Sequence, residues 1–580
     1  MLFKRVACAI CALLLLSAFV MPTFATEGGI LPSGMPYSEV GKAVKDYAAE
    51  HHETTSGVAV AVFDRNDTIY EDYFGYANRE DGIVMDAQTV IEWGSVTKLT
   101  VWVSVMQLWE QGKIDLNNNI QVYLPDGFLK KLNYDKPITM LDLMNHTAGF
   151  EELVFGLNAE GEESILSLEE ALYKYQPEQR FEPGVVQAYS NYGAALAGFI
   201  VERISGQPYY AYVKEHIFEP LGMEHSALLP DLSDNPWVRT QRGQLHCYRE
   251  DCSLIANGRE YVNLYPCGMC TSTLEDLTKF GQALLVPSSP LFEKNTTYEK
   301  LFEPSAFCGD TDVTSCCHGF WTIYGVPSLV YHAGNTTGCS SVLYLDLKTG
   351  SGMAIMTNQH YETVYNYGLP KEVFYQSVAA PQNQFAGFAE NSRSIWGGPL
   401  KLYSLFNTVS LSAISGYVTE TDSYGVQRYS YLGGDLVPVS RASVIVRYAS
   451  VILWGLASAF SLLRIVVRIV QRLRRKQKSP LGVWGMWSCI VQLPFPLLML
   501  PLALSLMTME WWPIWSYRLV FICACVLCIA MAVLFLFGIL RKQRNELKRT
   551  QKLFRGILLV NLSISIWNIL YWNLFMFWMI

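Results

Sequence analysis

The chain has 580 residues, a hydrophobic fraction of 51% and a formal net charge of −8. This length exceeds that of one ordinary domain, and the apolar residues concentrate after residue 443, where basic clusters separate them. Because Lys and Arg gather in that last part, the preceding residues are more acidic than the total, which argues against nucleic acid as a partner.

The N-terminus has the pattern of an export signal. Lys4 and Arg5 precede an apolar run over residues 6–21, and residues 23–25 offer small side chains at the two positions that a signal peptidase reads. We therefore predict a signal peptide over residues 1–25. An uncleaved membrane anchor is the alternative.

Residues 26–380 have the alternation and turn signals of a mixed α and β domain. Two strands are predicted early and three late, with helices between them. This order predicts an α+β fold in which both ends of the domain close one antiparallel sheet, flanked by helices. The expected strands are 57–63, 68–76, 329–332, 340–345 and 352–357, and the expected helices include 37–52, 101–111, 140–144, 274–285 and 364–378.

Residues 381–443 lack a strong period, so we predict a membrane-proximal connector there. Alternation over residues 415–439 is enough for a hairpin within this connector.

Four long apolar runs make up most of the remaining chain, and each is close to the ~20 residues that a helix needs to cross a bilayer. Basic loops follow the first and third runs, and three tryptophans follow the second. The positive-inside rule then places the basic loops in the cytoplasm and the domain before residue 444 outside it. The sequence predicts a four-helix transmembrane bundle over 444–580, with spans near 444–468, 483–508, 518–540 and 556–579.

Eight cysteines lie between the predicted signal and the predicted spans. An even number in an exported domain suggests disulfides, and Cys247 with Cys252, and Cys267 with Cys270, are close enough in sequence to pair locally. A zinc site at 267–270 is the alternative. No second Cys-x-x-Cys or His-x-x-x-His follows at the spacing of a zinc finger, so no metal is expected.

Ser95 and Lys98 stand three residues apart at the start of a buried helix, in the stretch Trp93-Gly94-Ser95-Val96-Thr97-Lys98. Residues at this spacing share a helix face, so the hydroxyl and the amine can meet. A serine hydroxyl becomes a nucleophile when a neighbouring base takes its proton, and a buried lysine amine can be that base. A capped amphipathic helix with a solvated lysine is the alternative for so short a motif.

Tyr189-Ser190-Asn191 has the order expected of a partner for this serine. A tyrosine hydroxyl beside Ser95 and Lys98 can pass a proton to the leaving group, and Asn191 can hold the substrate carbonyl or Lys98. The alternative is a core tyrosine followed by a turn asparagine.

His332-Ala333-Gly334-Asn335 lies on a predicted strand. Gly334 lets a substrate backbone approach the strand, and the N–H groups of Asn335 and Ser95 are candidates for an oxyanion hole. His332 is expected to donate to a substrate carboxylate or to the tyrosine. A histidine satisfied at a strand end is the alternative.

Together, Ser95-x-x-Lys98, Tyr189-x-Asn191 and His332-x-Gly334 resemble the three motifs of the serine β-lactamase and penicillin-binding-protein superfamily. The Tyr-x-Asn form is similar to the branch of class C β-lactamases and D-alanyl-D-alanine carboxypeptidases. The resemblance covers about residues 38–380. It implies a β-lactamase/transpeptidase-like fold with a helical subdomain, and catalysis that needs no metal or organic cofactor. An exported hydrolase followed by membrane helices also resembles the layout of colibactin-activating peptidases.

The chain departs from the class C pattern at two places. Those enzymes usually carry Lys-Thr-Gly where this chain has His332-Ala333-Gly334, and a histidine there is similar to esterases and peptidases of the wider family. This departure weakens the expectation of penicillin hydrolysis and of carboxylate recognition. Cys267 and Cys270 also occupy a stretch that is usually rich in glycine.

The resemblance, together with the predicted spans and their basic loops, implies a multi-pass serine hydrolase of the bacterial cell membrane, with its catalytic domain outside the cytoplasm. It would act through an acyl-enzyme on amides or esters that contain D-amino acids, with the substrate and the lipid bilayer as its expected partners. A membrane receptor that β-lactams acylate without efficient turnover is the alternative. Transport by the bundle is less favoured, because no strongly ionisable residue lies deep in a predicted span.

Overall fold

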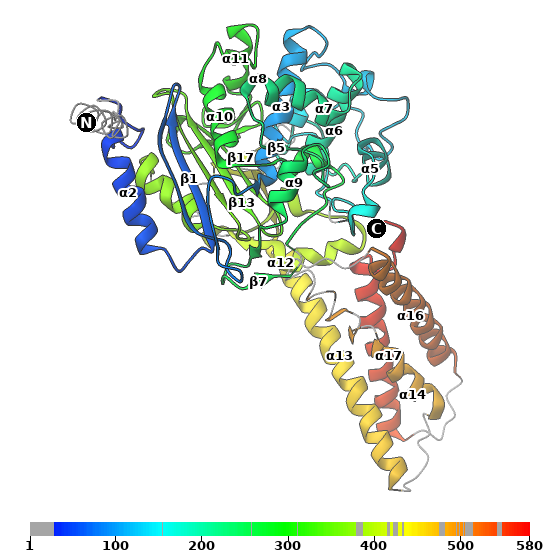
Figure 1. The fold of residues 1–580 in the computed structure, drawn as a ribbon. Coiled ribbons are helices and arrows are strands. Elements are labelled where there is room, and N and C mark those ends of the chain that lie inside the picture. The colour runs from blue at the N-terminus through cyan, green and yellow to red at the C-terminus, as the bar shows by residue number, and fades with distance from the viewer. Residues whose placement is uncertain are drawn as a thin grey trace, which may run out of the picture.

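The structure is a computed structural model (Figure 1). It describes residues 28–579 apart from 154, 257, 310, 379–386, 414–417, 422–426, 432–433, 475–481, 495, 498, 501, 503, 505–513 and 542–547. The predicted signal peptide, residues 1–25, lies outside the described residues and stays a prediction.

A nine-stranded antiparallel sheet forms the centre of the first domain. Its strand order is β3-β2-β1-β14-β13-β12-β11-β10-β9, so the first strands of the domain pair directly with the last. Val58 of β1 lies opposite Thr357 of β14, which confirms the predicted sheet closed by both ends of the domain. The strands are β1 Gly57–Asp64, β2 Thr68–Asn78, β3 Ile83–Val84, β9 Ala306–Phe307, β10 Thr314–Cys317, β11 Phe320–Ile323, β12 Val326–Asn335, β13 Ser340–Asp346 and β14 Ser351–Thr357.

Helices cover both faces of this sheet, which explains why β1 is apolar without interruption. Successive side chains of a strand point to opposite faces. Val58, Val60 and Val62 pack into an apolar cluster with α2 (Tyr37–Glu50), whereas Ala59, Ala61 and Phe63 pack with α3 (Lys98–Glu110) and α10 (Leu274–Leu285). Figure 1 shows α2 on one side of the sheet and α3 and α10 on the other.

Further elements complete the helical part of the domain beside α3. The longest of them, α6 (Asn191–Ser205), packs on α3 and carries one of the predicted motifs at its start. The others are α4 Met140–Met144, α5 Leu168–Lys174, α7 Tyr209–Val213, α8 Glu219–Leu221, α9 Pro236–Arg242 and α11 Asn295–Phe302, with the short strands β4 Ile91–Glu92, β5 Ser226–Ala227, β6 Cys247–Tyr248, β7 Leu254–Ile255 and β8 Thr271–Ser272.

The helix predicted over residues 364–378 is shorter and less regular than expected. It consists of two wide turns, Val364–Gly368 and Pro370–Phe374, and the chain is extended at Tyr375. Pro370 has no N–H to donate to a preceding carbonyl, which prevents a regular α-helix through this point.

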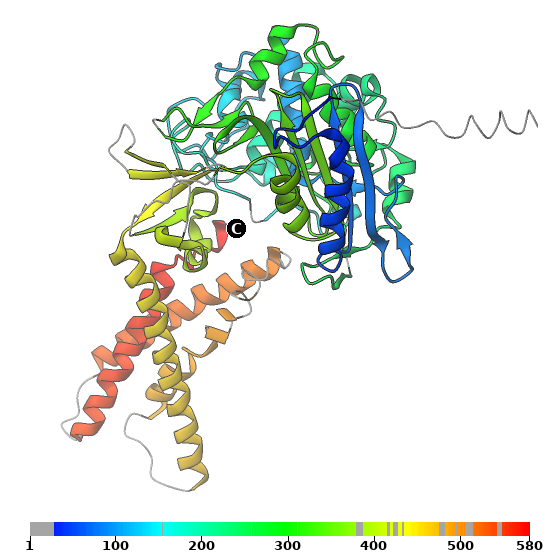
Figure 2. The ribbon, with the colours of Figure 1, turned by 90° about the vertical axis from the view of Figure 1, so that its left-hand side faces the viewer.

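Residues 387–439, within the predicted connector, form a second sheet that we call the accessory sheet. Its strand order is β16-β15-β19-β18-β17. The hairpin predicted within 415–439 corresponds to the antiparallel strands β17, β18 and β19. Figure 2 shows this sheet between the first domain and the C-terminal helices. Its strands are β15 Phe388–Asn391, β16 Thr408–Ser410, β17 Val418–Thr421, β18 Gln427–Tyr431 and β19 Gly434–Val439, with the short helix α12 Ser404–Asn407.

Three of the described C-terminal helices are long and apolar enough to cross a membrane: α13 (Arg441–Leu473), α16 (Ile514–Leu540) and α17 (Arg549–Tyr571). The span predicted over 483–508 begins as α14 (Gly482–Ile490), which is too short to cross a bilayer, and much of its remainder lies outside the described residues. The described residues therefore contain three helices that could form a membrane bundle, and the fourth predicted span stays a prediction.

Candidate active site

Ser95 lies in a tight turn that precedes α3. The turn spans Gly94–Thr97, and Gly94 has a φ of +51°, in the left-handed region that glycine adopts without steric cost. Trp93, just before it, is fixed on both sides: its indole N–H donates to Ser272 Oγ (2.7 Å), and its carbonyl accepts from Ser341 Oγ (2.6 Å). The backbone that carries the serine is thus held between the short strand β8 and strand β13.

Lys98 is fully buried and contacts three oxygen atoms. Its Nζ lies 3.0 Å from Ser95 Oγ, 2.7 Å from Asn191 Oδ1 and 2.6 Å from the carbonyl oxygen of Cys267. The amide oxygen and the carbonyl can only accept, so they bind two N–H groups. The third contact of Nζ is with the Ser95 hydroxyl, and loss of one proton from the ammonium would leave a lone pair facing that hydroxyl. The geometry therefore suits transfer of the serine proton to Lys98.

Tyr189 lies beside this pair at the start of α6. Ser190 caps the helix by accepting the N–H of Gly193, which directs Asn191 towards Lys98. The Lys98 ammonium lies 4.8 Å from the centre of the Tyr189 ring. The Tyr189 hydroxyl is buried and has no hydrogen-bond partner among the described residues. A phenol in this position can donate its proton to a substrate atom next to Ser95.

Strand β12 lies directly against the turn of Ser95 at Gly334. An added methyl group at Gly334 would lie 2.0 Å from the Trp93 carbonyl oxygen and 2.6 Å from the Ser95 nitrogen, so only glycine fits. An added methyl group at Gly94 would likewise lie 2.5 Å from the backbone nitrogen of Asn335. This packing brings the main-chain N–H groups of Ser95 and Asn335 to neighbouring positions. The Asn335 side chain accepts from Ser340 Oγ (2.7 Å) and so supports the β12–β13 turn.

His332 is buried on β12, and its environment differs from the one expected. Burial, and then the charge of Lys98, lower its pKa to about 3, so the ring is neutral. Its Nδ1 lies 2.8 Å from the carbonyl of Ala333 and must donate to it, which leaves Nε2 as an acceptor without a protein partner among the described residues. The expected donor to a carboxylate or to Tyr189 is therefore an acceptor in this structure.

An aromatic cluster around Tyr189 was not among the predicted site residues. The rings of His146 and Tyr189 lie 4.5 Å apart, and Trp321 stacks on His146 at 5.5 Å. His146 accepts the N–H of Ser190 at Nδ1, and burial holds its pKa well below the ordinary range. This histidine thus fixes the position of the Tyr189 motif while it stays neutral. The sequence stretch that could have pointed to His146 is His146-Thr147-Ala148-Gly149.

The accessory-sheet region adds Arg393 beside the same tyrosine and Trp396 beside Glu152. The Arg393 guanidinium lies 4.8 Å from the centre of the Tyr189 ring and pairs with Glu152 (3.2 Å). The Trp396 indole N–H donates to the Glu152 carbonyl (2.8 Å), and Glu152 also accepts from Asn191 (3.2 Å). A chain of polar contacts therefore runs from Lys98 through Asn191 and Glu152 to Arg393.

The family of the chain follows from comparison with known proteins. The family model described as Beta-lactamase matches residues 42–374, which is more than half of the chain and contains all three predicted motifs. The chain belongs to the beta-lactamase family.

Relatives of this beta-lactamase-family protein include penicillin-binding proteins and carboxypeptidases. A protein designated PbpX in Bacillus subtilis (strain 168) is 28% identical over 255 residues, which are 43% of this chain and 59% of that protein. The D-alanyl-D-alanine-carboxypeptidase/endopeptidase AmpH of Escherichia coli (strain K12) is 27% identical over 269 residues, 45% of this chain and 66% of AmpH. The chain thus spans less than two thirds of the length of both relatives.

A solved structure with a similar fold is the octameric penicillin-binding protein homologue from Pyrococcus abyssi. It has 19% sequence identity and a TM-score of 0.47, and the match covers 70% of this chain and 91% of that one.

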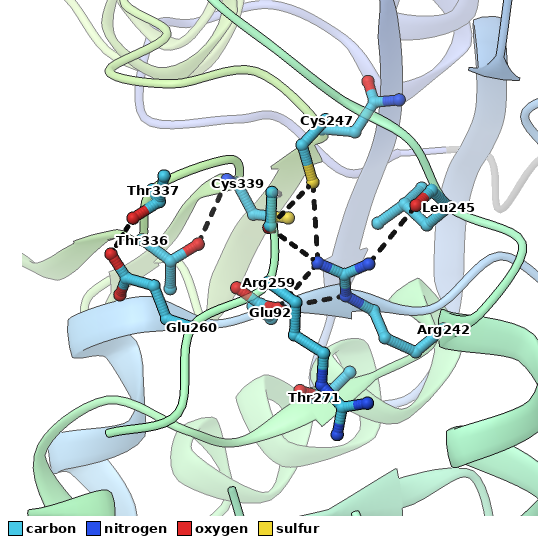
Figure 3. Close-up of polar contacts among 12 residues, drawn as sticks. Glu92, Arg242, Leu245, Cys247, Arg259, Glu260, Thr271, Thr336, Thr337 and Cys339 are labelled. Carbon is cyan, nitrogen blue, oxygen red and sulfur yellow. Dashed lines mark hydrogen bonds and ion pairs between the residues drawn. The ribbon is translucent and has the colours of Figure 1, made fainter. Parts of the chain in front are cut away.

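A buried polar cluster lies next to the site motifs of this family member (Figure 3). Arg242 pairs with Glu92, three residues before Ser95, at 2.9 Å, and approaches Cys247 Sγ at 3.5 Å. The thiol of Cys339 hydrogen-bonds Cys247, which holds the pKa of Cys247 below its ordinary value. No disulfide and no metal-binding cluster occurs among the described residues, and Cys247 faces Cys339 rather than the expected Cys252.

Proposed function

We propose that this protein is a membrane-anchored serine hydrolase that works through an acyl-enzyme. The observation that carries the proposal is the surrounding of Lys98, whose Nζ contacts Ser95 Oγ at 3.0 Å while Asn191 Oδ1 and the Cys267 carbonyl accept from the same nitrogen. Membership of the beta-lactamase family supports the same chemistry. The three long apolar C-terminal helices support the membrane anchor.

The reaction begins when Lys98 takes the Ser95 proton and Ser95 Oγ attacks the carbonyl carbon of an amide or ester. The negative charge that develops on the carbonyl oxygen is then held by the N–H groups of Ser95 and Asn335. Tyr189 donates its proton to the leaving amine or alcohol and regains one from the Lys98 ammonium. Water attacks the acyl-enzyme in the second half, with the same groups acting in reverse.

The proposed substrates contain D-amino acids, and the proposed location of the catalytic domain is outside the cytoplasm. The similarity to AmpH, whose name states a D-alanyl-D-alanine carboxypeptidase, supports the substrate class. Basic loops after the first and third apolar runs support the orientation through the positive-inside rule.

Intact-mass spectrometry of the full-length protein in detergent tests this proposal. We expect a fluorophosphonate to add one adduct, and the Ser95→Ala variant to add none. A penicillin adduct that persists for hours would instead support a β-lactam receptor that is acylated without turnover. Absence of labelling by both reagents would overturn the hydrolase assignment.

A further inference from the structure

Arg393 is a charged residue that the accessory sheet brings to the candidate active site. Its guanidinium carbon lies 4.8 Å from the centre of the Tyr189 ring, although the two residues are far apart in sequence. Its side chain is 46% exposed, whereas that of its ion-pair partner Glu152 is 7% exposed. The arginine therefore stands between a buried carboxylate and solvent, next to the proposed proton donor.

Main-chain contacts hold Arg393 at this place. The residue before it, Ser392, donates its hydroxyl to the carbonyl of Gln187 (2.8 Å), two residues before Tyr189. Asn391 Oδ1 accepts the backbone N–H of Arg393 at 3.0 Å. The segment that carries the arginine is thus tied to the segment that carries the tyrosine, so the two side chains keep a defined relation.

Most of the binding capacity of this guanidinium is unused. Nε donates to Glu152 Oε2 at 3.2 Å, and the two terminal nitrogens have no acceptor among the residues that the structure describes. A guanidinium presents five N–H donors in a planar fork that matches a carboxylate. The other cation at the site, Lys98, is occupied by three oxygen contacts, and His332 is neutral.

The position of Arg393 relative to Tyr189 indicates which part of a substrate it meets. In the proposed function Tyr189 protonates the leaving group. When the leaving group is an α-amino acid, its carboxylate is attached to the carbon next to the departing nitrogen, and so lies within reach of groups around the tyrosine. His332 cannot bind that carboxylate by charge, because it is neutral and presents an acceptor.

We propose that Arg393 binds the free α-carboxylate of the leaving amino acid, so that the enzyme removes C-terminal residues from acylated peptides. This inference rests on the proposed function, because Tyr189 locates the leaving group. Arg393 is then a specificity-determining residue supplied by the accessory sheet. It takes the role that a lysine or a charged histidine at position 332 would otherwise serve.

A purely structural role makes a different prediction. If Arg393 only balanced the charge of Glu152, its loss would disturb Asn191 through Glu152 and would slow all substrates alike. The measurable quantity that separates the two roles is the ratio of kcat/KM for a substrate with a free C-terminal carboxylate to that for the same substrate as its amide.

The experiment uses the full-length protein in detergent, with N-acyl-D-alanyl-D-alanine and its C-terminal amide as the two substrates. We expect the wild type to prefer the free carboxylate, and Arg393→Gln to lower the ratio by ~10- to 100-fold, as for loss of hydrogen bonds to a charged group. Arg393→Lys should keep part of the preference. Arg239→Gln is the matched control, because Arg239 is 43% exposed and pairs with Glu162.

Equal loss on both substrates in Arg393→Gln, or a wild type without preference for the carboxylate, overturns this inference. If both peptides remain intact while an uncharged ester is hydrolysed in a Ser95-dependent reaction, the inference also fails and the hydrolase assignment stands. Failure of the proposed function itself is recognised separately, since Ser95 would then not react with a fluorophosphonate.

Discussion

The two acceptors that hold Lys98 decide what this residue can do. Asn191 Oδ1 and the Cys267 carbonyl fix the direction of Nζ, so that its third contact is with the Ser95 hydroxyl. A solvated lysine would turn freely and would lack this direction. In the proposed mechanism, this fixed direction serves proton transfer from Ser95.

Replacement of Lys98 by methionine keeps the length of the side chain and removes the base. We expect the rate of Ser95 labelling by a fluorophosphonate to fall by ~100- to 10,000-fold, the usual contribution of a general base. Lys348→Met, on the exposed β13–β14 turn, is the control and should label at the wild-type rate. Wild-type labelling of Lys98→Met would contradict the assigned role.

Three buried histidines make the stability of the protein depend on pH. Burial lowers the pKa of His332 to about 3 and that of His318 to about 4, and it lowers the pKa of His146 well below the ordinary 6.5. Between these values and 6.5 the unfolded chain binds protons that the folded chain does not. Stability is therefore lost as the pH falls below about 6.5, by up to about 1.4 kcal/mol per pH unit and histidine.

The thermal midpoint of the full-length protein in detergent, compared at pH 7.5 and pH 5, measures this loss. His332→Asn removes one of the titrating groups, so its midpoint should fall less than that of the wild type over the same interval. His52→Asn, at a highly exposed position, should behave as the wild type does. An equal fall in His332→Asn and wild type would show that His332 is not held neutral.

At the scale of elements, the contact between β12 and the turn of Ser95 leaves no room for a side chain at Gly334. Gly334→Ala should push the strand away and separate the N–H groups of Ser95 and Asn335. Loss of one oxyanion donor costs ~100-fold or more in rate, and we expect this reduction in Ser95 acylation. Gly193→Ala is the control, since the nearest atoms to its added methyl group lie at an ordinary 3.6 Å. If Ser95 in Gly334→Ala were acylated at the wild-type rate, the close contact between β12 and the Ser95 turn would be excluded.

The β12–β13 turn also lies next to the pair of thiols. Because the Cys339 thiol donates to Cys247, we expect oxidation by a disulfide reagent to link these two cysteines. Cys252 Sγ lies instead near the Thr54 carbonyl (3.6 Å) and is not expected to join. Peptide mapping under non-reducing conditions identifies the link, with Cys339→Ser as the control. A Cys247–Cys252 link would contradict the observed arrangement.

The elements that could be predicted are those whose signal is local. The short apolar runs of β1 and β14 predict strands, and the spacing of Ser95 and Lys98 predicts their contact on one turn. The contact of Arg393 with Glu152 joins residues 241 positions apart and follows from no local pattern. The neutral state of His332 likewise depends on burial and on Lys98, which the three-residue motif does not encode.

At the scale of the whole molecule, the accessory sheet links the catalytic domain to the bundle. It contacts the catalytic domain through Asp435, which bonds the backbone of Gln187, and the bundle through Lys401, whose Nζ donates to the Tyr571 carbonyl (2.9 Å). Phe155 of the catalytic domain also touches Tyr517 of α16, with ring centres 4.7 Å apart. The beta-lactamase-family domain therefore packs against the long apolar C-terminal helices.

Truncation at two points separates the contribution of the accessory sheet from that of the bundle. A chain that ends at residue 440 keeps the sheet, whereas one that ends at 378 loses Arg393 and Trp396 and leaves Glu152 without its cation. We expect Ser95 labelling to be ~10-fold slower in the shorter chain, since truncation, unlike Arg393→Gln, also removes the Trp396 contact that holds Glu152 beside Asn191. Equal rates in the two chains would show that the sheet is a spacer only.

The origin of Arg393 has a consequence for recombination between related enzymes. The side chains around Tyr189 come from two parts of the chain, one inside the region that the family model matches and one after it. A chimera that exchanges only residues 42–374 would combine a reacting centre from one parent with a selectivity residue from the other. A chimera that is meant to carry over the substrate preference of one parent should therefore exchange residues 387–439 together with residues 42–374.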